Sequence, residues 1–163
     1  RELDVSSPII CGDIYCSGQV LSGAEDRPVR KIGYMASADH AHNLSVVNAA
    51  LVRYLREHPA VTFEFFGSIP APPEFAEFGT RIVHAPRIAN YGDFLNEFAN
   101  YRWDIGICPL TPIPFNLMKA NTKWVEYSSV GAAVVASRDT VYDDCCSEAA
   151  GCWPPAKANG MTP

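Results

Sequence analysis

The chain has 163 residues, of which 48% are hydrophobic and 11% aromatic, so it can bury one core and leaves little room for two full domains. Thirteen basic and eighteen acidic side chains give a net charge of −5 without a basic run, which argues against a nucleic-acid groove. No apolar stretch approaches the roughly 18–20 residues that span a bilayer, so we expect no transmembrane segment.

Short apolar runs alternate with segments of helical period from residue 30 onward. A strand is expected at residues 31–36, followed by a helix whose apolar face recurs every three or four positions and which ends before Pro59; this face comprises Leu44, Val47, Leu51 and Leu55. Residues 61–66 form the next expected strand, because they are β-branched and aromatic. The proline-rich residues 69–73 are expected to form a loop.

The same alternation continues to residue 136. Strands are expected at residues 81–84, 105–108 and 132–136, and helices at residues 91–101 and 118–130, the last ending at Gly131. Strands joined through helices are typical of a parallel sheet covered on both faces. The sequence therefore predicts the α/β class, as a Rossmann-like doubly wound parallel sheet.

The ends of the chain differ from its middle. The chain starts with Arg1 rather than Met, so we expect a piece of a longer protein. Residues 1–29 are expected to form an irregular lead-in or linker, residues 30–148 the globular domain, and residues 149–163, which hold several Gly and Pro residues, an irregular tail. No positively charged start precedes an apolar signal core, and we expect a cytoplasmic protein.

The cysteines bear on the compartment and on metal binding; they are Cys11, Cys16, Cys108, Cys145, Cys146 and Cys152. None of their spacings is the two-residue interval of a zinc knuckle. A chain of this length does not need a disulfide framework, and Cys108 lies in an apolar run, where a free thiol behaves as a small buried hydrophobic group. We expect mostly reduced cysteines, no zinc and a reducing cytosol.

Ligands of doubly wound sheets bind at the carboxyl ends of the strands, so the loops after the expected strands carry the candidate site. The sequence contains no GxGxxG, no GxxxxGK[ST] and no GxSxG motif. Their absence argues against ordinary NAD binding, P-loop nucleotide hydrolysis and an α/β-hydrolase.

The most informative stretch is FNLMKANTKWVEYSSVG, residues 115–131, which precedes the apolar run at residues 132–136. Three further short motifs lie earlier in the chain, at residues 32–34 (IGY), 65–67 (FFG) and 104–110 (DIGICPL). Through the order of these motifs over residues 30–142, the chain resembles the C-terminal nucleotide-sugar-binding domain of group 1 GT-B glycosyltransferases. The resemblance implies one Rossmann-like half of a GT-B fold.

The resemblance also implies a site for a nucleotide-diphosphate sugar, most simply a UDP- or GDP-sugar, which would be the donor substrate and not a resident cofactor. Glu126 would accept hydrogen bonds from the ribose hydroxyls. Lys119, at the start of the same helix, would bind the diphosphate. The remaining implied contacts lie after the first and third expected strands. Ser37 and His40 would contact the phosphates or the departing sugar, and His84 and Arg87 would contact the base.

The implied activity is transfer of a sugar to an acceptor held by a missing N-terminal domain, so this domain alone is expected to be inactive, and no residue is assigned as a general base. The sequence lacks the Asp-x-Asp motif of metal-dependent transferases of the other major fold, which agrees with a metal-independent site. Met118 and Ala120 depart from the family, which often has Glu and Ser at these positions. Asn43 stands where it often has Asp.

Other interpretations of the same residues remain open. Glu126 and Lys123 can be read as solvated helix charges, Lys119 as a flexible surface lysine, and His40 as a cap of the following helix. The alternative function is a non-catalytic nucleotide-recognition or interaction domain with the same fold. A flavodoxin-like module of unrelated purpose is a more distant one.

Overall fold

The computed structural model describes residues 27–146. The predictions for Cys11, Cys16 and Cys152, for most of the lead-in at residues 1–29 and for the tail at residues 149–163 lie outside the described residues.

The described residues form a five-stranded parallel sheet. Its strands are β1 (Lys31–Ala36), β2 (Thr62–Gly67), β3 (Ile82–Ala85), β4 (Ile105–Cys108) and β5 (Ala133–Ala136). Their spatial order is β3-β2-β1-β4-β5, and each neighbouring pair is parallel. Every strand lies within one residue of its expected range, which confirms the α/β class and the parallel sheet.

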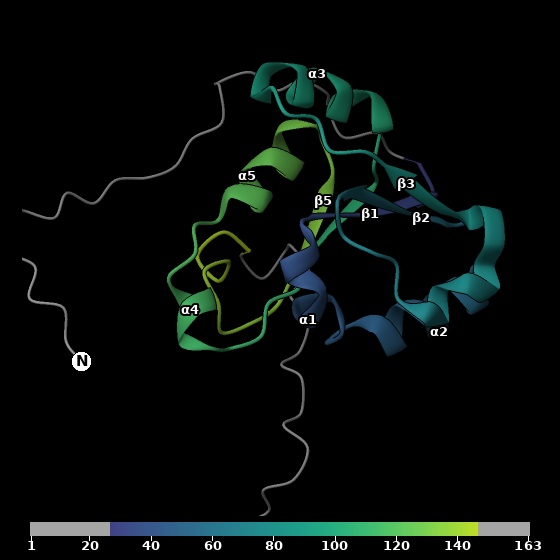
Figure 1. Cartoon of the computed structure of the whole chain (residues 1–163), viewed down its shortest axis with the longest axis horizontal. Coiled ribbons are helices and arrows are strands. Elements are labelled where there is room, and N and C mark those ends of the chain that lie inside the picture. The colour runs from purple at the N-terminus through teal and green to yellow at the C-terminus, as the bar shows by residue number, and fades with distance from the viewer. Residues whose placement is uncertain (1–26, 147–163) are drawn as a thin grey trace, which may run out of the picture.

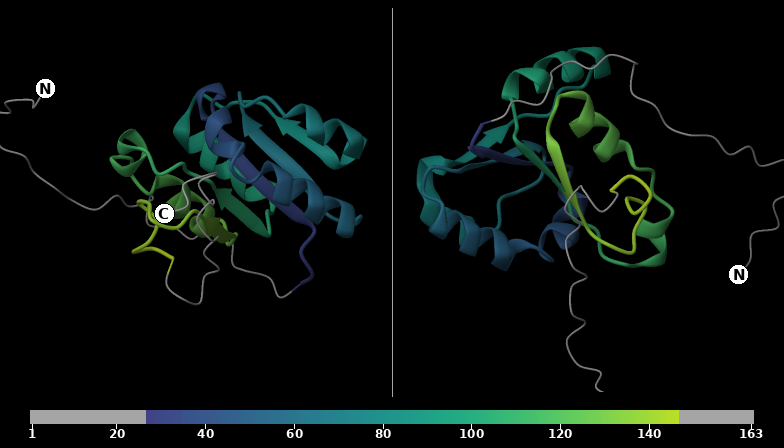
Figure 2. Two further views of the ribbon diagram at one scale, coloured as in Figure 1. Left: turned by 90° about the horizontal axis from the view of Figure 1, so that it is seen from below. Right: turned by 180° about the vertical axis from the view of Figure 1, so that it is seen from behind.

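Helices cover both faces of this sheet, as Figures 1 and 2 show. One face packs against α1 (Ala41–Leu44), α2 (Asn48–Glu57) and the 3-10 segment η2 (Pro73–Arg81). The other packs against α3 (Tyr91–Tyr101) and α5 (Thr122–Ser129). Successive strand residues point to opposite faces, so in β2 Phe63 and Phe65 enter the first core and Phe66 enters the second.

Two helices differ from their expected ranges. The helix expected to carry Leu44 through Leu55 is divided into α1 and α2, because the Ser45 hydroxyl donates to the His42 carbonyl and the Val47 N–H donates to the Leu44 carbonyl, which makes a tight turn. The 3-10 turn η1 (Ala38–His40) precedes α1.

The expected helix at residues 118–130 is shorter and begins at Thr122, so the prediction that Lys119 stands at its start is wrong. A separate short helix, α4 (Pro114–Leu117), precedes it. The Asn116 amide donates to the Thr111 carbonyl at 2.9 Å, and the Lys119 N–H donates to the Asn116 carbonyl at 3.2 Å. These bonds fold the segment back on itself, so that Lys119 lies in the turn between the two helices.

A close approach of α5 to the sheet is made possible by Gly106 of β4. A Cβ atom at this position would lie 2.3 Å from Cδ2 of Tyr127, so any larger residue would displace the ring. Tyr127 is fully buried and immediately follows Glu126 on α5. The packing of Tyr127 therefore sets where Glu126 lies.

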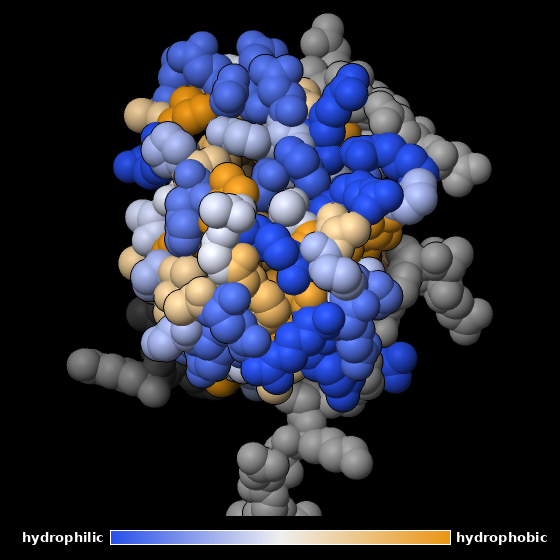
Figure 3. Space-filling view, turned by 90° about the vertical axis from the view of Figure 1, so that its right-hand side faces the viewer, coloured by the Kyte–Doolittle hydropathy of each residue, from blue (hydrophilic) through white to orange (hydrophobic). Residues whose placement is uncertain are grey.

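The surface of the described part carries apolar side chains in a few places. From the side of η2, hydrophilic side chains surround smaller apolar areas (Figure 3). Several of the large exposed apolar side chains lie in and beside α4, at Ile113, Phe115, Leu117 and Met118. None of the helices between residues 27 and 146 is long and apolar enough to cross a membrane.

Candidate functional site

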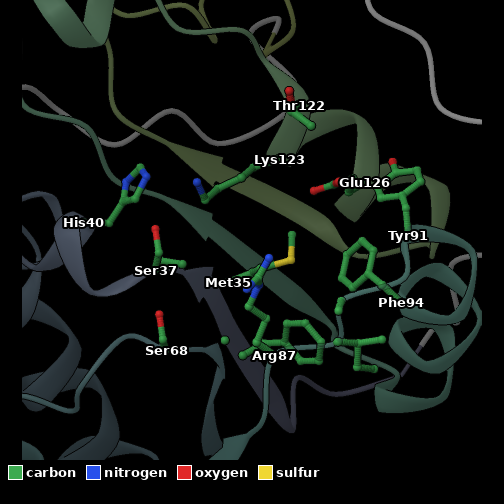
Figure 4. Close-up of a pocket in the computed structure, with 15 residues that line it drawn as sticks. Met35, Ser37, His40, Ser68, Arg87, Tyr91, Phe94, Thr122, Lys123 and Glu126 are labelled. Atoms are coloured by element: carbon green, nitrogen blue, oxygen red, sulfur yellow. The ribbon is translucent and has the colours of Figure 1, made fainter.

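A cavity of about 340 Å³ lies at the carboxyl edge of the sheet (Figure 4). Its floor consists of residues 35–37 at the end of β1 and residues 66–68 at the end of β2. The walls consist of residues 87–89 before α3, Tyr91 at its start, His40 of η1 and one face of α5. This is the edge at which doubly wound sheets bind their ligands.

The floor depends on a glycine where β2 ends. Gly67 has a φ of +108°, and a Cβ atom there would lie 2.5 Å from the carbonyl oxygen of Ala36. A side chain would be strained at this φ and would collide with the end of β1. Glycine therefore lets the ends of β1 and β2 lie together beneath the cavity.

The structure brings together four of the six residues implied as site residues: Ser37, His40, Arg87 and Glu126 all line the cavity. His84 does not line it. Its ring stacks on Phe65 of the neighbouring strand, with 5.1 Å between ring centroids. Lys119 is also absent from the lining, and its Nζ atom lies 5.0 Å from the centre of the Phe115 ring.

The cavity also contains residues that the sequence did not single out as site residues, namely Lys123, Thr122 and Tyr91. Lys123 could have been found from its spacing, because it lies three residues before Glu126 and so shares its helix face. Tyr91 carried no comparable signal, since its position above the cavity depends on how α3 packs on the sheet.

Glu126 is the buried hydrogen-bond acceptor of the site, with 7% of its surface exposed. Burial raises the pKa of its carboxyl group, while a hydrogen bond from the Tyr91 hydroxyl and the charge of Lys123 act in the opposite direction. Figure 4 shows Tyr91 beside Glu126 at one side of the cavity. The carboxylate oxygens that Tyr91 leaves free can accept further hydrogen bonds from a ligand.

The opposite side of the cavity favours an anion. His40 and Lys123 face one another there (Figure 4). Burial lowers the pKa of Lys123, and the nearby charge of Lys119 lowers it further. The pKa of His40 falls to about 4, first because of burial and then because of Lys123 and Lys119. An anionic ligand would offset the repulsion between Lys123 and Lys119.

Ser37 joins the cavity to the turn that follows β1. Its hydroxyl donates a hydrogen bond to the Asp39 carboxylate, and this bond lowers the pKa of Asp39. Because Ser37 is exposed and its hydroxyl proton is directed at Asp39, its oxygen remains available to accept a hydrogen bond.

Metal ligands do not cluster in the part of the chain that the structure describes: residues 27–146 contain no group of three or more His, Cys, Asp or Glu that could hold a metal ion. Cys108, Cys145 and Cys146 are in the thiol form and make no disulfide. Burial raises the pKa of the Cys108 thiol to about 12, so this group is protonated and unreactive at neutral pH.

No family model and no curated protein matches the sequence, and the similarity to known proteins is one of structure. The C-terminal domain of a group 1 glycosyl transferase from Francisella tularensis matches with a TM-score of 0.53 and 18% identity, covering 83% of this chain and 78% of that domain. The fold is that of a GT-B C-terminal domain.

Two longer proteins match this chain as well. A UDP-forming α,α-trehalose-phosphate synthase from Burkholderia xenovorans has a TM-score of 0.57 and 15% identity over 83% of this chain. A trehalose-6-phosphate structure from E. coli with bound UDP-2-fluoro glucose has a TM-score of 0.56 and 14% identity over 79% of this chain. The match spans about a third of each of these longer chains, 34% in both cases.

Proposed function

We propose that this chain is the donor-binding domain of a glycosyltransferase and that its cavity holds the nucleotide-diphosphate part of a nucleotide sugar. The observation that carries the proposal is the pairing, on one face of α5, of the buried acceptor Glu126 with the cation Lys123, both lining one cavity. A nucleoside diphosphate needs both groups, an acceptor for its ribose and positive charge for its phosphates. The E. coli structure with bound UDP-2-fluoro glucose lends support.

Glu126 is the proposed ribose contact. A carboxylate has two oxygens and can accept from two adjacent hydroxyls at once. The Tyr91 hydroxyl donates to this carboxylate and holds it against the wall formed by α3. Charge-assisted hydrogen bonds are stronger than neutral ones, so this contact should contribute a large part of the affinity for the nucleoside.

Lys123 is the proposed diphosphate contact, with Lys119 as a second source of positive charge close by. The first N–H groups of α5 have no partner within the helix, and its dipole favours an anion at this end. Departure of a nucleoside diphosphate develops negative charge on the phosphate oxygens. Fixed positive groups in a partly buried cavity stabilise that charge, so we propose a metal-independent site.

The remaining wall consists of residues 87–89, Tyr91 and Phe94, and we assign it to the base. Arg87 is the charged donor on this wall. His84 lies outside the cavity, stacked on Phe65, and is the less suitable of the two residues proposed for the base.

Sugar transfer also needs an acceptor. We propose that an N-terminal domain of a longer protein binds the acceptor and completes the cleft, and that the domain described here is inactive by itself. A second candidate function, nucleotide recognition without catalysis, is favoured by Met118. This residue is 81% exposed and stands where the resembled family often has a Glu that contacts the donor sugar.

Calorimetric titration with UDP, GDP, ADP and their sugars tests the proposal. We expect one nucleotide to bind, and Glu126→Ala to weaken its binding by about 1.5–3 kcal/mol, the range for a hydrogen bond to a charged group. Glu97→Ala is the matched control, since Glu97 is an exposed carboxylate of α3 outside the cavity. The Glu97→Ala variant should bind the nucleotide with the affinity of the wild type.

Two results would count against the proposal. If the wild-type domain binds no nucleotide at millimolar concentration, the titration is repeated on a longer chain that includes the preceding domain, and failure there overturns the donor-binding assignment. If nucleoside diphosphates bind but the attached sugar adds no affinity and no transfer occurs in the longer chain, nucleotide recognition without catalysis is the better description.

A further inference from the structure

A buried amide joins α1 to the segment that follows β4. The side chain of Asn43 is fully buried. Its Oδ1 atom accepts hydrogen bonds from the Thr111 backbone N–H at 3.0 Å, from the Thr111 hydroxyl at 3.1 Å and from the Asn116 amide at 2.9 Å. Three donors on one oxygen, from residues about 70 positions away along the chain, hold this side chain in a single orientation.

These bonds also decide which end of the Asn43 amide faces His40. A backbone N–H can only donate, so the Asn43 atom that faces Thr111 must be the oxygen. The nitrogen therefore points the other way, and it lies 3.4 Å from Nδ1 of His40. An amide nitrogen can only donate, so this contact is a hydrogen bond when Nδ1 of His40 accepts and carries no proton.

We infer that Asn43 is a positioning residue that fixes His40 as a neutral imidazole protonated on Nε2. A neutral imidazole with an unprotonated Nδ1 carries its single proton on Nε2. An imidazolium would place an Nδ1–H against the Asn43 N–H, with two donors facing each other and no acceptor between them.

The charges around His40 agree with this assignment. Lys123 of α5 and Lys119 in the preceding turn both disfavour an imidazolium, and of the groups on its own segment Asp39 favours it and His42 opposes it. Burial acts in the same direction as the lysines. The half-buried ring lines the cavity, where it offers a ligand an uncharged N–H donor.

The inference rests on the proposed function only in naming the acceptor of this N–H, a phosphate oxygen of the nucleotide. On that assignment the two lysines supply the positive charge at the diphosphate, and His40 supplies a directed hydrogen bond. His40 would then not be a proton donor to the leaving group, because an acid would need the imidazolium that Asn43 disfavours.

Long-range ¹H–¹⁵N correlation spectra of the chain labelled at histidine test the inference without any ligand. The chain has four histidines, and the signal of His40 is identified by its loss in His40→Gln. We expect the pattern of a neutral ring protonated on Nε2 at pH 7. A ring protonated on Nδ1, a mixture of both tautomers or an imidazolium at this pH would overturn the inference.

The Asn43→Asp variant provides a second test of the inference. One carboxylate oxygen can still accept from Thr111 and Asn116, while the other can accept from Nδ1 of His40. The His40 proton should then move to Nδ1, and the pKa of His40 should rise toward or above the ordinary value of about 6.5. An unchanged tautomer and pKa in a folded Asn43→Asp variant would contradict a positioning role.

Thr111→Val is the matched control. It removes one donor from the same buried cluster but leaves the Asn43 nitrogen facing His40, so the Nε2–H pattern should persist. If Asn43→Asp does not fold, the wild-type tautomer decides the question alone. A failure of UDP to bind would count against the proposed function but would not affect the tautomer result, because the tautomer is measured without a ligand.

Discussion

The phenol oxygen of Tyr127 accepts a hydrogen bond of 3.0 Å from the backbone N–H of Met35. Tyr127 follows Glu126 on α5, and Met35 lies at the end of β1 on the cavity floor. The bond therefore ties one wall of the cavity directly to its floor. The Tyr127 ring also packs on Gly106 of β4, so a single side chain sets the position of α5 over two strands.

Tyr127→Phe should lower the free energy of unfolding by about 1–3 kcal/mol, because the buried N–H of Met35 loses its acceptor. Urea unfolding followed by fluorescence measures the change. Ser128→Ala, on an exposed neighbour in the same helix, serves as the comparison and should lie within about 0.5 kcal/mol of the wild type. A Tyr127→Phe variant as stable as the wild type would show that this bond does not anchor α5.

Gly106→Ala should be more damaging than an ordinary surface substitution. The new methyl group would lie 2.3 Å from the ring of Tyr127, and overpacking of this kind costs about 1–3 kcal/mol or more. Gly92→Ala in α3 is the control, since its Cβ would meet only the side-chain oxygen of Asn90, at 3.3 Å. Equal melting temperatures for the two variants would refute the close packing of α5 on β4.

Lys123→Ala and Lys119→Ala should weaken nucleotide binding unequally. Lys123 lines the cavity and Lys119 does not, so Lys123→Ala should cost more affinity for UDP, about tenfold or more for the loss of a charged hydrogen bond. Neither variant should change the affinity for uridine, which has no phosphate. A larger loss in Lys119→Ala would instead favour the site implied by the sequence resemblance.

Stability should depend on pH through His40. Its folded-state pKa of about 4 lies below the ordinary value, so the unfolded chain takes up the proton first as the pH falls. The stability of the wild type should therefore be full above about pH 6.5 and fall between pH 6.5 and 4. Solvent screens the half-exposed ring, so we expect a loss of about 1 kcal/mol.

His40→Gln isolates this effect, because Glu126 titrates in an overlapping range with the opposite sign. Burial raises the pKa of Glu126, so the folded state takes up this proton before the unfolded state does as the pH falls, which favours folding. The difference between wild type and His40→Gln in urea titrations at several pH values removes that contribution. A difference that is independent of pH would mean that His40 keeps an ordinary pKa in the folded chain.

The strands and the fold class could be predicted from the sequence alone. The strands are short, mostly apolar runs, such as residues 105–108 before Pro109, and such a pattern can be recognised from the local sequence. The order of the motifs from residue 30 to residue 142 also pointed to the C-terminal domain of a GT-B fold, which the structural neighbours share.

The composition of the site was decided by contacts between distant parts of the chain. Whether Lys119 or Lys123 enters the cavity depends on where α5 begins. The segment that precedes α5 is tied to α1 by Asn43, Thr111 and Asn116, which meet across about 70 residues. The stacking of His84 on Phe65 follows from the pairing of β2 with β3. Local sequence determines which segments form strands, but only tertiary packing selects the side chains that share a cavity, because hydrogen bonds and close contacts between remote segments override local helix preference.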